Sequence, residues 1–92
     1  MITSDRRAAV TSAVKRMVIL ESRLAVPEDR VRDDEPLNGE LLSVNSLGFL
    51  GMLVRIEDEL DAVLPDDLFI GRPVETVADV VDLVLFAVEA NR

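Results

Sequence analysis

The chain contains no cysteine, no histidine, no tryptophan and no tyrosine, and its aromatic residues are three phenylalanines. Without a thiol or an imidazole, it cannot form disulfides, Cys/His zinc sites or the usual Cys–His and Ser–His catalytic pairs. The chain can still form a hydrophobic core, because 49% of its 92 residues are hydrophobic. We therefore expect residues 1–92 to form a single domain with an apolar core and no disulfide or structural metal.

Long hydrophobic runs are absent as well. The longest, Leu83 to Val88, is far shorter than the roughly 20 residues that span a membrane. Charged residues at 5–7 interrupt the start of the chain, so no secretory leader is expected. The lack of cysteine agrees with a reducing compartment. Together these features predict a cytoplasmic protein.

Acidic residues dominate the charge, which is −8 overall and unevenly spread. Residues 1–26 hold five basic and two acidic side chains, whereas residues 27–92 hold five basic and sixteen acidic ones. Such a surface repels phosphate backbones and anionic lipids, so nucleic acids and membranes are poor partners and basic protein surfaces are better ones. The simpler alternative is that the acids serve solubility alone.

Apolar periodicity predicts a first helix that begins near Thr3 or Ser4 and ends before Pro27. Its buried stripe comprises residues three or four apart, widened by two valines: Val10, Ala13, Met17, Leu20 and Leu24, with Val14 and Val18. A long connection follows over residues 25–45, rich in charge and interrupted by prolines and a glycine. A connection this long needs anchors, for which the candidates are Val31, Leu37, Leu41 and Leu42. The acidic residues of this connection do not have the spacing of a calcium-binding loop, so we expect them to form a solvent-exposed face.

A second helix is predicted over residues 47–60, with two distinct apolar lines. The first has core spacing: Phe49, Met52, Leu53, Ile56 and Leu60. The second lies beside two glycines: Leu47, Leu50 and Val54, with Gly48 and Gly51. A helix without a polar face in its first two turns is either wholly buried or offers a face to partners, and a domain this small favours the partner face. The cost of the glycines, about 1 kcal/mol each, suggests a close approach by another group.

The rest of the chain supplies two more helices. A short one is expected to start at Pro65 and to end before Gly71 and Pro73, with Leu68, Phe69 and Ile70 in the core. A longer one begins after Thr76, which forms a capping box with Asp79. Its apolar stripe consists of valines: Val77, Val80, Val81, Val84 and Val88. Runs of valine favour strands, but the polar residues of this segment recur at helical rather than even spacing, so we predict a helix. The predicted fold is all-α: a small four-helix bundle of three main helices and a short third one, with a long first loop.

Catalysis is not predicted. The serine at position 46 has no histidine to activate it, and the single lysine, Lys15, lies on another helix. The paired carboxylates lie on faces that are predicted to be exposed, where nothing would split their pKa values. We expect no catalytic residues and no metal site.

The stretch VNSLGFLGMLVRIEDELDAVLPDD, residues 44–67, resembles the central region of acyl carrier proteins. That family has a Gly-x-Asp-Ser-Leu motif, then a recognition helix that ends in acids and is followed by proline. The order of the other predicted elements also agrees, so the resemblance covers essentially the whole chain. It implies that Ser46 receives 4′-phosphopantetheine from a phosphopantetheinyl transferase. In two motif positions the chain departs from the family: Asn45 replaces the aspartate and Ser43 the glycine.

The resemblance further implies a partner surface formed by Asn45, Leu47, Leu50, Val54, Glu57 and Asp58, which would meet basic docking patches on loading, condensing or transferring enzymes. The expected function is that of a monomeric carrier that holds acyl or aminoacyl intermediates as thioesters. Gly48 and Gly51, in place of acids common in fatty-acid carriers, favour polyketide or related natural-product synthesis. The alternative is a helical interaction module that keeps the carrier fold but is never modified.

Overall fold

The computed structural model of the chain describes residues 2–61, 63 and 64, and 74–90. Within these residues it contains three α-helices, α1 (Ile2–Glu21), α2 (Ser46–Leu60) and α3 (Val77–Ala90), and one 3₁₀ turn, η1 (Glu28–Arg30). Isolated bridges such as Pro36 with Thr76 occur in the described loops, but no strand does. The all-α prediction is confirmed. The short helix predicted from Pro65 lies outside the described residues.

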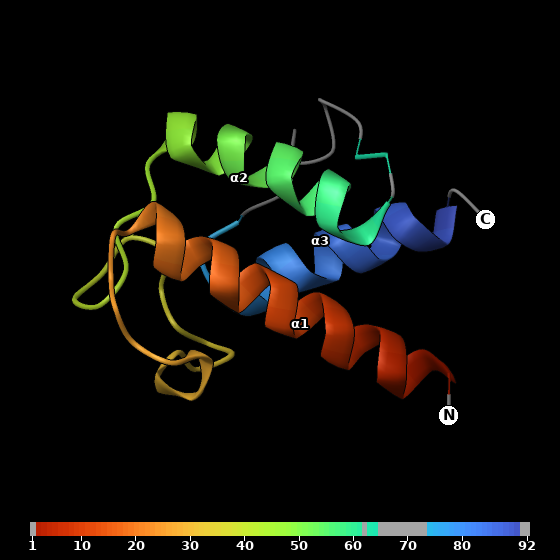
Figure 1. Ribbon diagram of the computed structural model, residues 1–92, viewed down its shortest axis with the longest axis horizontal. Helices are drawn as coiled ribbons and strands as arrows, with labels where there is room; N and C mark the ends of the chain where they lie inside the picture. The colour runs from red at the N-terminus through yellow and green to blue at the C-terminus, as the bar shows by residue number, and fades with distance from the viewer. Residues whose placement is uncertain (1, 62, 65–73, 91–92) are drawn as a thin grey trace.

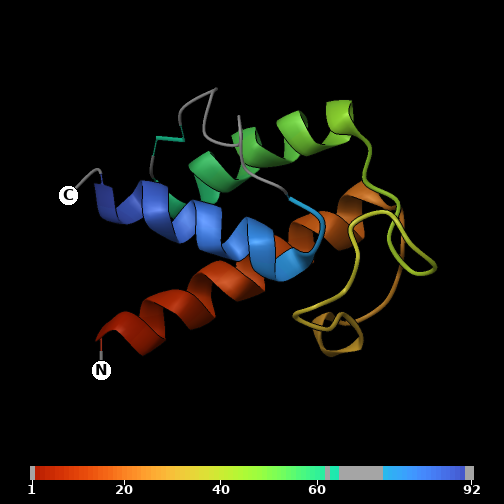
Figure 2. The same cartoon turned by 180° about the vertical axis from the view of Figure 1, so that it is seen from behind.

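α1 is the helix on which the other two pack. Both α2 and α3 contact α1 and run antiparallel to it, as Figures 1 and 2 show from opposite sides. The loop that contains η1 gathers at the end of the molecule where α1 ends and where α2 and α3 begin (Figure 1). Two helix starts and one helix end therefore meet at the same end of the bundle.

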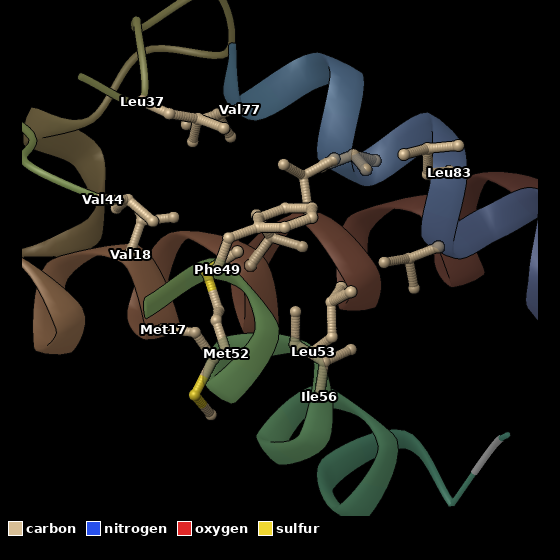
Figure 3. Packing of buried hydrophobic residues seen from close by; sticks show 14 of the residues in the cluster. Met17, Val18, Leu37, Val44, Phe49, Met52, Leu53, Ile56, Val77 and Leu83 are labelled. Carbon is tan, nitrogen blue, oxygen red and sulfur yellow. The ribbon is translucent and has the colours of Figure 1, made fainter. Parts of the chain in front are cut away.

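The core joins the apolar faces of all three helices. Figure 3 shows the ring of Phe49 reaching from α2 among the side chains of α3, while Met52 lies beside Met17 of α1. The predicted stripes are largely confirmed, since the following helical residues are buried: Val10, Ala13, Val14, Met17, Val18, Phe49, Met52, Leu53, Ile56, Val77, Val80, Val81 and Val84. Leu24, Leu60 and Val88 are partly buried against this cluster.

One predicted core residue is wrong: Leu20 is 59% exposed, and Ile19 is buried in its place. Ile19 lies four and seven residues after Lys15 and Ser12, so the three share a face of α1. That face carries the loop, because Lys15 pairs with Asp33 at 2.9 Å and the Ser12 hydroxyl donates to Glu28 at 2.6 Å. α1 is thus buried on two sides, and Leu20 lies on neither.

The end of α1 is a Schellman motif. Arg23 has φ 59°, in the left-handed region, and its N–H donates to the Leu20 carbonyl while the N–H of Leu24 donates to the Ile19 carbonyl, each at 3.0 Å. The helix therefore ends at Glu21, several residues before Pro27. This turn brings Leu24 back against the core.

The long loop is anchored as predicted. Val31, Leu37 and Leu42 are buried, Leu41 is partly buried, and Val44 is a further buried anchor that the pattern did not single out. The Leu37 N–H donates to the Glu75 carbonyl and the Leu37 carbonyl accepts from the Val44 N–H, both at 2.9 Å. These bonds allow a connection of this length inside a small domain.

The start of α3 has all its first N–H groups satisfied, which a buried helix end requires. The loop carbonyls of Glu35 and Asp33 accept from the N–H groups of Val77 and Ala78 at 3.0 and 2.7 Å. Hydrogen bonding and attraction to Lys15 lower the pKa of the Asp33 carboxyl.

The predicted capping box completes this end: Asp79 Oδ2 accepts from the Thr76 N–H at 3.1 Å, and Thr76 Oγ1 accepts from the Asp79 N–H at 3.3 Å. Asp79 Oδ2 also accepts from the Glu75 N–H at 2.9 Å, the bond that contributes most to holding the pKa of Asp79 below its ordinary value.

An Asp79→Ala variant should lose about 1 kcal/mol of unfolding free energy at neutral pH, because two backbone N–H groups lose their acceptor. Since the folded protein lowers the pKa of Asp79, this contribution is complete above the unfolded value, about 4, and disappears as the pH falls through the folded pKa. Urea denaturation of both proteins between pH 7 and pH 2.5 measures the difference. Glu89→Ala, on the exposed side of the same helix, should show no loss. Equal midpoints for wild type and Asp79→Ala at pH 7 would mean that these bonds add no stability.

Candidate functional site

The candidate site is the junction where the loop enters α2. Asn45 is the N-cap residue, with φ −86° and ψ 178°, and Ser46 is the first residue of the helix. Asn45 Oδ1 accepts from the Gly48 N–H at 2.7 Å, and the Asn45 carbonyl accepts from the Phe49 N–H at 2.8 Å. The predicted loop-to-helix transition is confirmed, and the amide of Asn45 does the capping that an aspartate could also do.

The junction is fixed from both sides. Before it, Val44 is buried and bonded to Leu37, and the Ser43 N–H donates to Ser22 Oγ at 2.8 Å in the turn that follows α1. After it, the ring of Phe49 is held in the core (Figure 3). Residues 45–48 therefore form a short segment in a defined position between two buried anchors.

The electrostatics at this helix start favour an anion. No acidic residue occupies the first turn of α2, and Asn45 is neutral. The partial positive charge of a helix N-terminus is thus not offset by a carboxylate of the helix itself. The Glu21 carboxylate, from α1, lies against Gly48 in this turn.

An exposed apolar line extends from the junction along α2. Leu47 is 80%, Val54 57% and Leu50 45% exposed, as the second apolar line required. Val63, just beyond the helix, adds another exposed apolar side chain that sequence reasoning did not include. Contiguous exposure of this kind is typical of a surface that meets another molecule.

The acids at the end of α2 differ in their availability. Glu57 Oε2 accepts from the Leu64 N–H at 2.6 Å, so this carboxylate holds the chain that leaves the helix. Glu59 is paired with Arg16 of α1, whose hydrogen bond holds the pKa of Glu59 below its ordinary value. Asp58 and Asp61, by contrast, are exposed and make no ion pair within the described residues. With Glu57 and Val63 they line a shallow hollow of about 350 Å³.

The flank of α2 that faces α1 was not anticipated from the sequence. A Cβ added at Gly48 would lie 2.5 Å from Glu21 Oε2, so glycine is what lets this carboxylate reach the helix. The same carboxyl group lies 3.8 Å from the guanidinium of Arg55. The expected close approach is confirmed at Gly48, whereas nothing lies within 4 Å of a Cβ added at Gly51. The sequence feature that could have indicated this contact is Arg55, a single arginine on an otherwise acidic and apolar helix.

A second hollow, of about 540 Å³, lies between α1 and the loop. Its charged groups are largely paired with one another, as in the bonds Lys15–Asp33 and Ser12–Glu28. The residues that line it are Arg7, Ala8, Thr11, Ser12, Lys15, Glu28, Asp29 and Asp33. We assign it no ligand, because its polar groups hold the loop to the helix.

Comparison with known proteins adds one finding. Residues 17–84 match the family model described as "Phosphopantetheine attachment site". The match spans the end of α1, the loop, all of α2 and the first half of α3. Neither a curated protein nor a solved structure is significantly similar to the chain. Among the described helices, none has the length and apolar character of a membrane span.

The two glycines of α2 should respond differently to substitution by alanine. Gly51→Ala should raise the unfolding free energy by roughly 0.5–1 kcal/mol, because alanine has the higher helix propensity and the added methyl group meets open space. Gly48→Ala should gain less or nothing, because its methyl group displaces Glu21. Urea denaturation monitored by circular dichroism measures both. An equal gain in the two variants would mean that Glu21 yields its position without cost.

Proposed function

The chain belongs to the phosphopantetheine-attachment family, whose members carry 4′-phosphopantetheine covalently on a serine, and we propose that in this chain the serine is Ser46. The matched region contains three serines: Ser22, Ser43 and Ser46. Ser22 Oγ accepts a hydrogen bond in the turn after α1, and Ser43 lies within the loop. Ser46 is the one that opens a helix. This position is the observation that carries the proposal.

The surroundings fit the group. A phosphodiester at residue 46 would place its negative charge at the positive end of α2, where the helix has no acid in its first turn and the Glu21 carboxylate lies against Gly48. Asn45 keeps its side chain on the Gly48 N–H and so holds the helix start in shape. The exposed side chains of Leu47 and Leu50 offer an apolar wall beside the attachment point.

The attached 4′-phosphopantetheine, the arm, supplies a terminal thiol that forms thioesters with acyl or aminoacyl groups. This chain has no cysteine and cannot supply such a thiol itself. The chain's own part is to hold the attachment residue at a fixed junction and to present the surface around it. We propose that residues 1–92 act as a single, monomeric, non-catalytic carrier domain. Gly48 and Gly51 in place of acids favour polyketide or related natural-product synthesis as its pathway.

The partners proposed are a phosphopantetheinyl transferase and the enzymes that load, extend or release the cargo. The exposed apolar residues Leu47, Leu50 and Val54 would make the central contact. Asp58 would meet a basic patch, since its carboxylate is not engaged by a described cation. Glu57 would contribute mainly through its charge, because its carboxylate already binds the Leu64 N–H.

The alternative function is an interaction module with the same fold and no arm. Asn45 is the observation in its favour, because it removes an acid where transferase, magnesium and coenzyme A would assemble. The two functions share the exposed surface of α2 and differ in the chemistry at residue 46.

Modification at Ser46 is tested by incubating the purified protein with coenzyme A, magnesium and a broad-specificity phosphopantetheinyl transferase. The intact mass should increase by one phosphopantetheine in the wild type and in Ser43→Ala, and should stay unchanged in Ser46→Ala. Peptide mapping of the product should place the group on Ser46. A wild type that gains no mass would favour the interaction module, and a modified Ser46→Ala would place the arm elsewhere.

Asn45→Asp should be modified severalfold faster than the wild type, because it restores a carboxylate at the reaction site while preserving the cap. Asn45→Ala should lose about 1 kcal/mol of stability, since the Gly48 N–H loses its acceptor. Initial rates by intact mass give the first quantity and urea denaturation the second. Equal rates for the wild type and the Asn45→Asp variant would show that the missing charge does not limit recognition.

A further inference from the structure

Arg55 is the only basic residue of α2, and its side chain is 56% exposed. On a helix its natural partner would be Glu59, four residues on. Arg16 of α1 takes the Glu59 carboxylate instead. Among the described residues Arg55 forms one ion pair, with Glu21, whose Oε1 lies 3.8 Å away, longer than a hydrogen bond. At this distance the guanidinium is neutralised only in part, and more than half of the side chain is open to solvent.

Glu21 is held on the α1 side of this contact. Its carboxylate lies against the backbone of Gly48, and its side chain is 27% exposed. The pair is thus asymmetric: the acid is lodged between two helices and the arginine extends towards solvent. A partner that approaches α2 therefore meets more of the arginine than of the acid.

Gly51 leaves room for such an approach. It precedes Arg55 by one helical turn, and nothing lies within 4 Å of the point where its Cβ would be. A side chain from another protein can therefore reach the helix backbone beside the guanidinium. Leu47 and Val54 border the same exposed side.

The charges on this surface are mixed. Asp58 and Asp61 follow Arg55 along the chain and are exposed and unpaired within the described residues, whereas Arg55 lies towards α1. A uniformly basic docking patch would gain at the two aspartates and be repelled at Arg55. A patch with one acid on its α1 side would be attracted at both.

We propose that Arg55 is a specificity-determining residue of this docking surface, and that the enzymes served by the chain present an acidic side chain opposite Arg55 beside the basic ones opposite Asp58 and Asp61. The inference rests on the proposed carrier function. It adds the charge pattern required of the partner. Glu21 tunes the preference, because it weakens the field of Arg55 without covering it.

The test uses two probes: a phosphopantetheinyl transferase whose carrier-binding patch is uniformly basic, and a variant of it in which one basic residue of the patch is replaced by glutamate. Binding of the apo protein is measured by titration calorimetry at low and high salt, without coenzyme A. Arg55→Glu should bind the basic probe about fivefold or more tighter than the wild type, and the gain should shrink at high salt. For the glutamate probe the order should reverse, with the wild type binding more tightly.

The matched control is Arg30→Glu, which makes the same charge change at an exposed position of η1. It should alter binding to either probe by less than about twofold. Glu21→Gln should weaken binding to the basic probe, and this effect should vanish when Arg55 is alanine. Far-ultraviolet circular dichroism establishes that each variant remains folded.

Equal effects of Arg55→Glu and Arg30→Glu, an unchanged order with the glutamate probe, or no binding by any variant would each overturn the proposal. The intact mass of the wild type after addition of coenzyme A and magnesium reports separately on the carrier function. If the arm is added while Arg55→Glu and Arg30→Glu change binding to the probes equally, the inference about Arg55 fails and the carrier function stands. If no arm is added while the order reverses between probes, the surface is selective as proposed and the carrier function fails.

Discussion

The two backbone groups of Leu37 join the starts of α2 and α3. Its N–H binds the Glu75 carbonyl at the entrance to α3, and its carbonyl binds the Val44 N–H two residues before Ser46. Its side chain is buried beside Val77 (Figure 3). The described parts of α2 and α3 each pack on α1, and this loop residue adds a direct link between the two helix starts. The candidate attachment residue owes its place to a loop carbonyl as much as to the helix it opens.

Much of this arrangement could be predicted from the sequence, because the signals were local. Helical spacing located α1, α2 and α3, and Thr76 with Asp79 marked the start of α3 by capping chemistry alone. The loop anchors followed from the need to bury isolated apolar residues in a charged segment. The stretch around Ser46 identified the junction because it resembles the Asp-Ser-Leu motif of a known family, with Asn45 in place of the aspartate, and not because its composition is unusual.

The remainder depended on contacts between distant segments, which periodicity does not contain. Ile19 is buried because the loop covers a second side of α1, and no pattern within the helix distinguishes that side from the one where Leu20 is exposed. The bond from the Leu64 N–H to Glu57 and the contact of Glu21 with Gly48 likewise engage glutamates, a residue type that by itself indicates solvent exposure. Each changes how the surface of α2 is interpreted.

Because some acidic side chains are paired within the fold, the residues that attract a basic partner are not all residues that contact it. All eighteen carboxylates contribute to the long-range field that guides a basic enzyme towards the protein. Several of them, including Glu28, Asp33 and Glu59, are paired with Arg16 or Lys15 and are therefore less available to a partner than an unpaired acid. Encounter rates would therefore reflect the total charge, whereas the lifetime of a complex would depend on a few groups along α2. A protein that must visit several enzymes in succession gains from that division, since it can arrive quickly and leave easily.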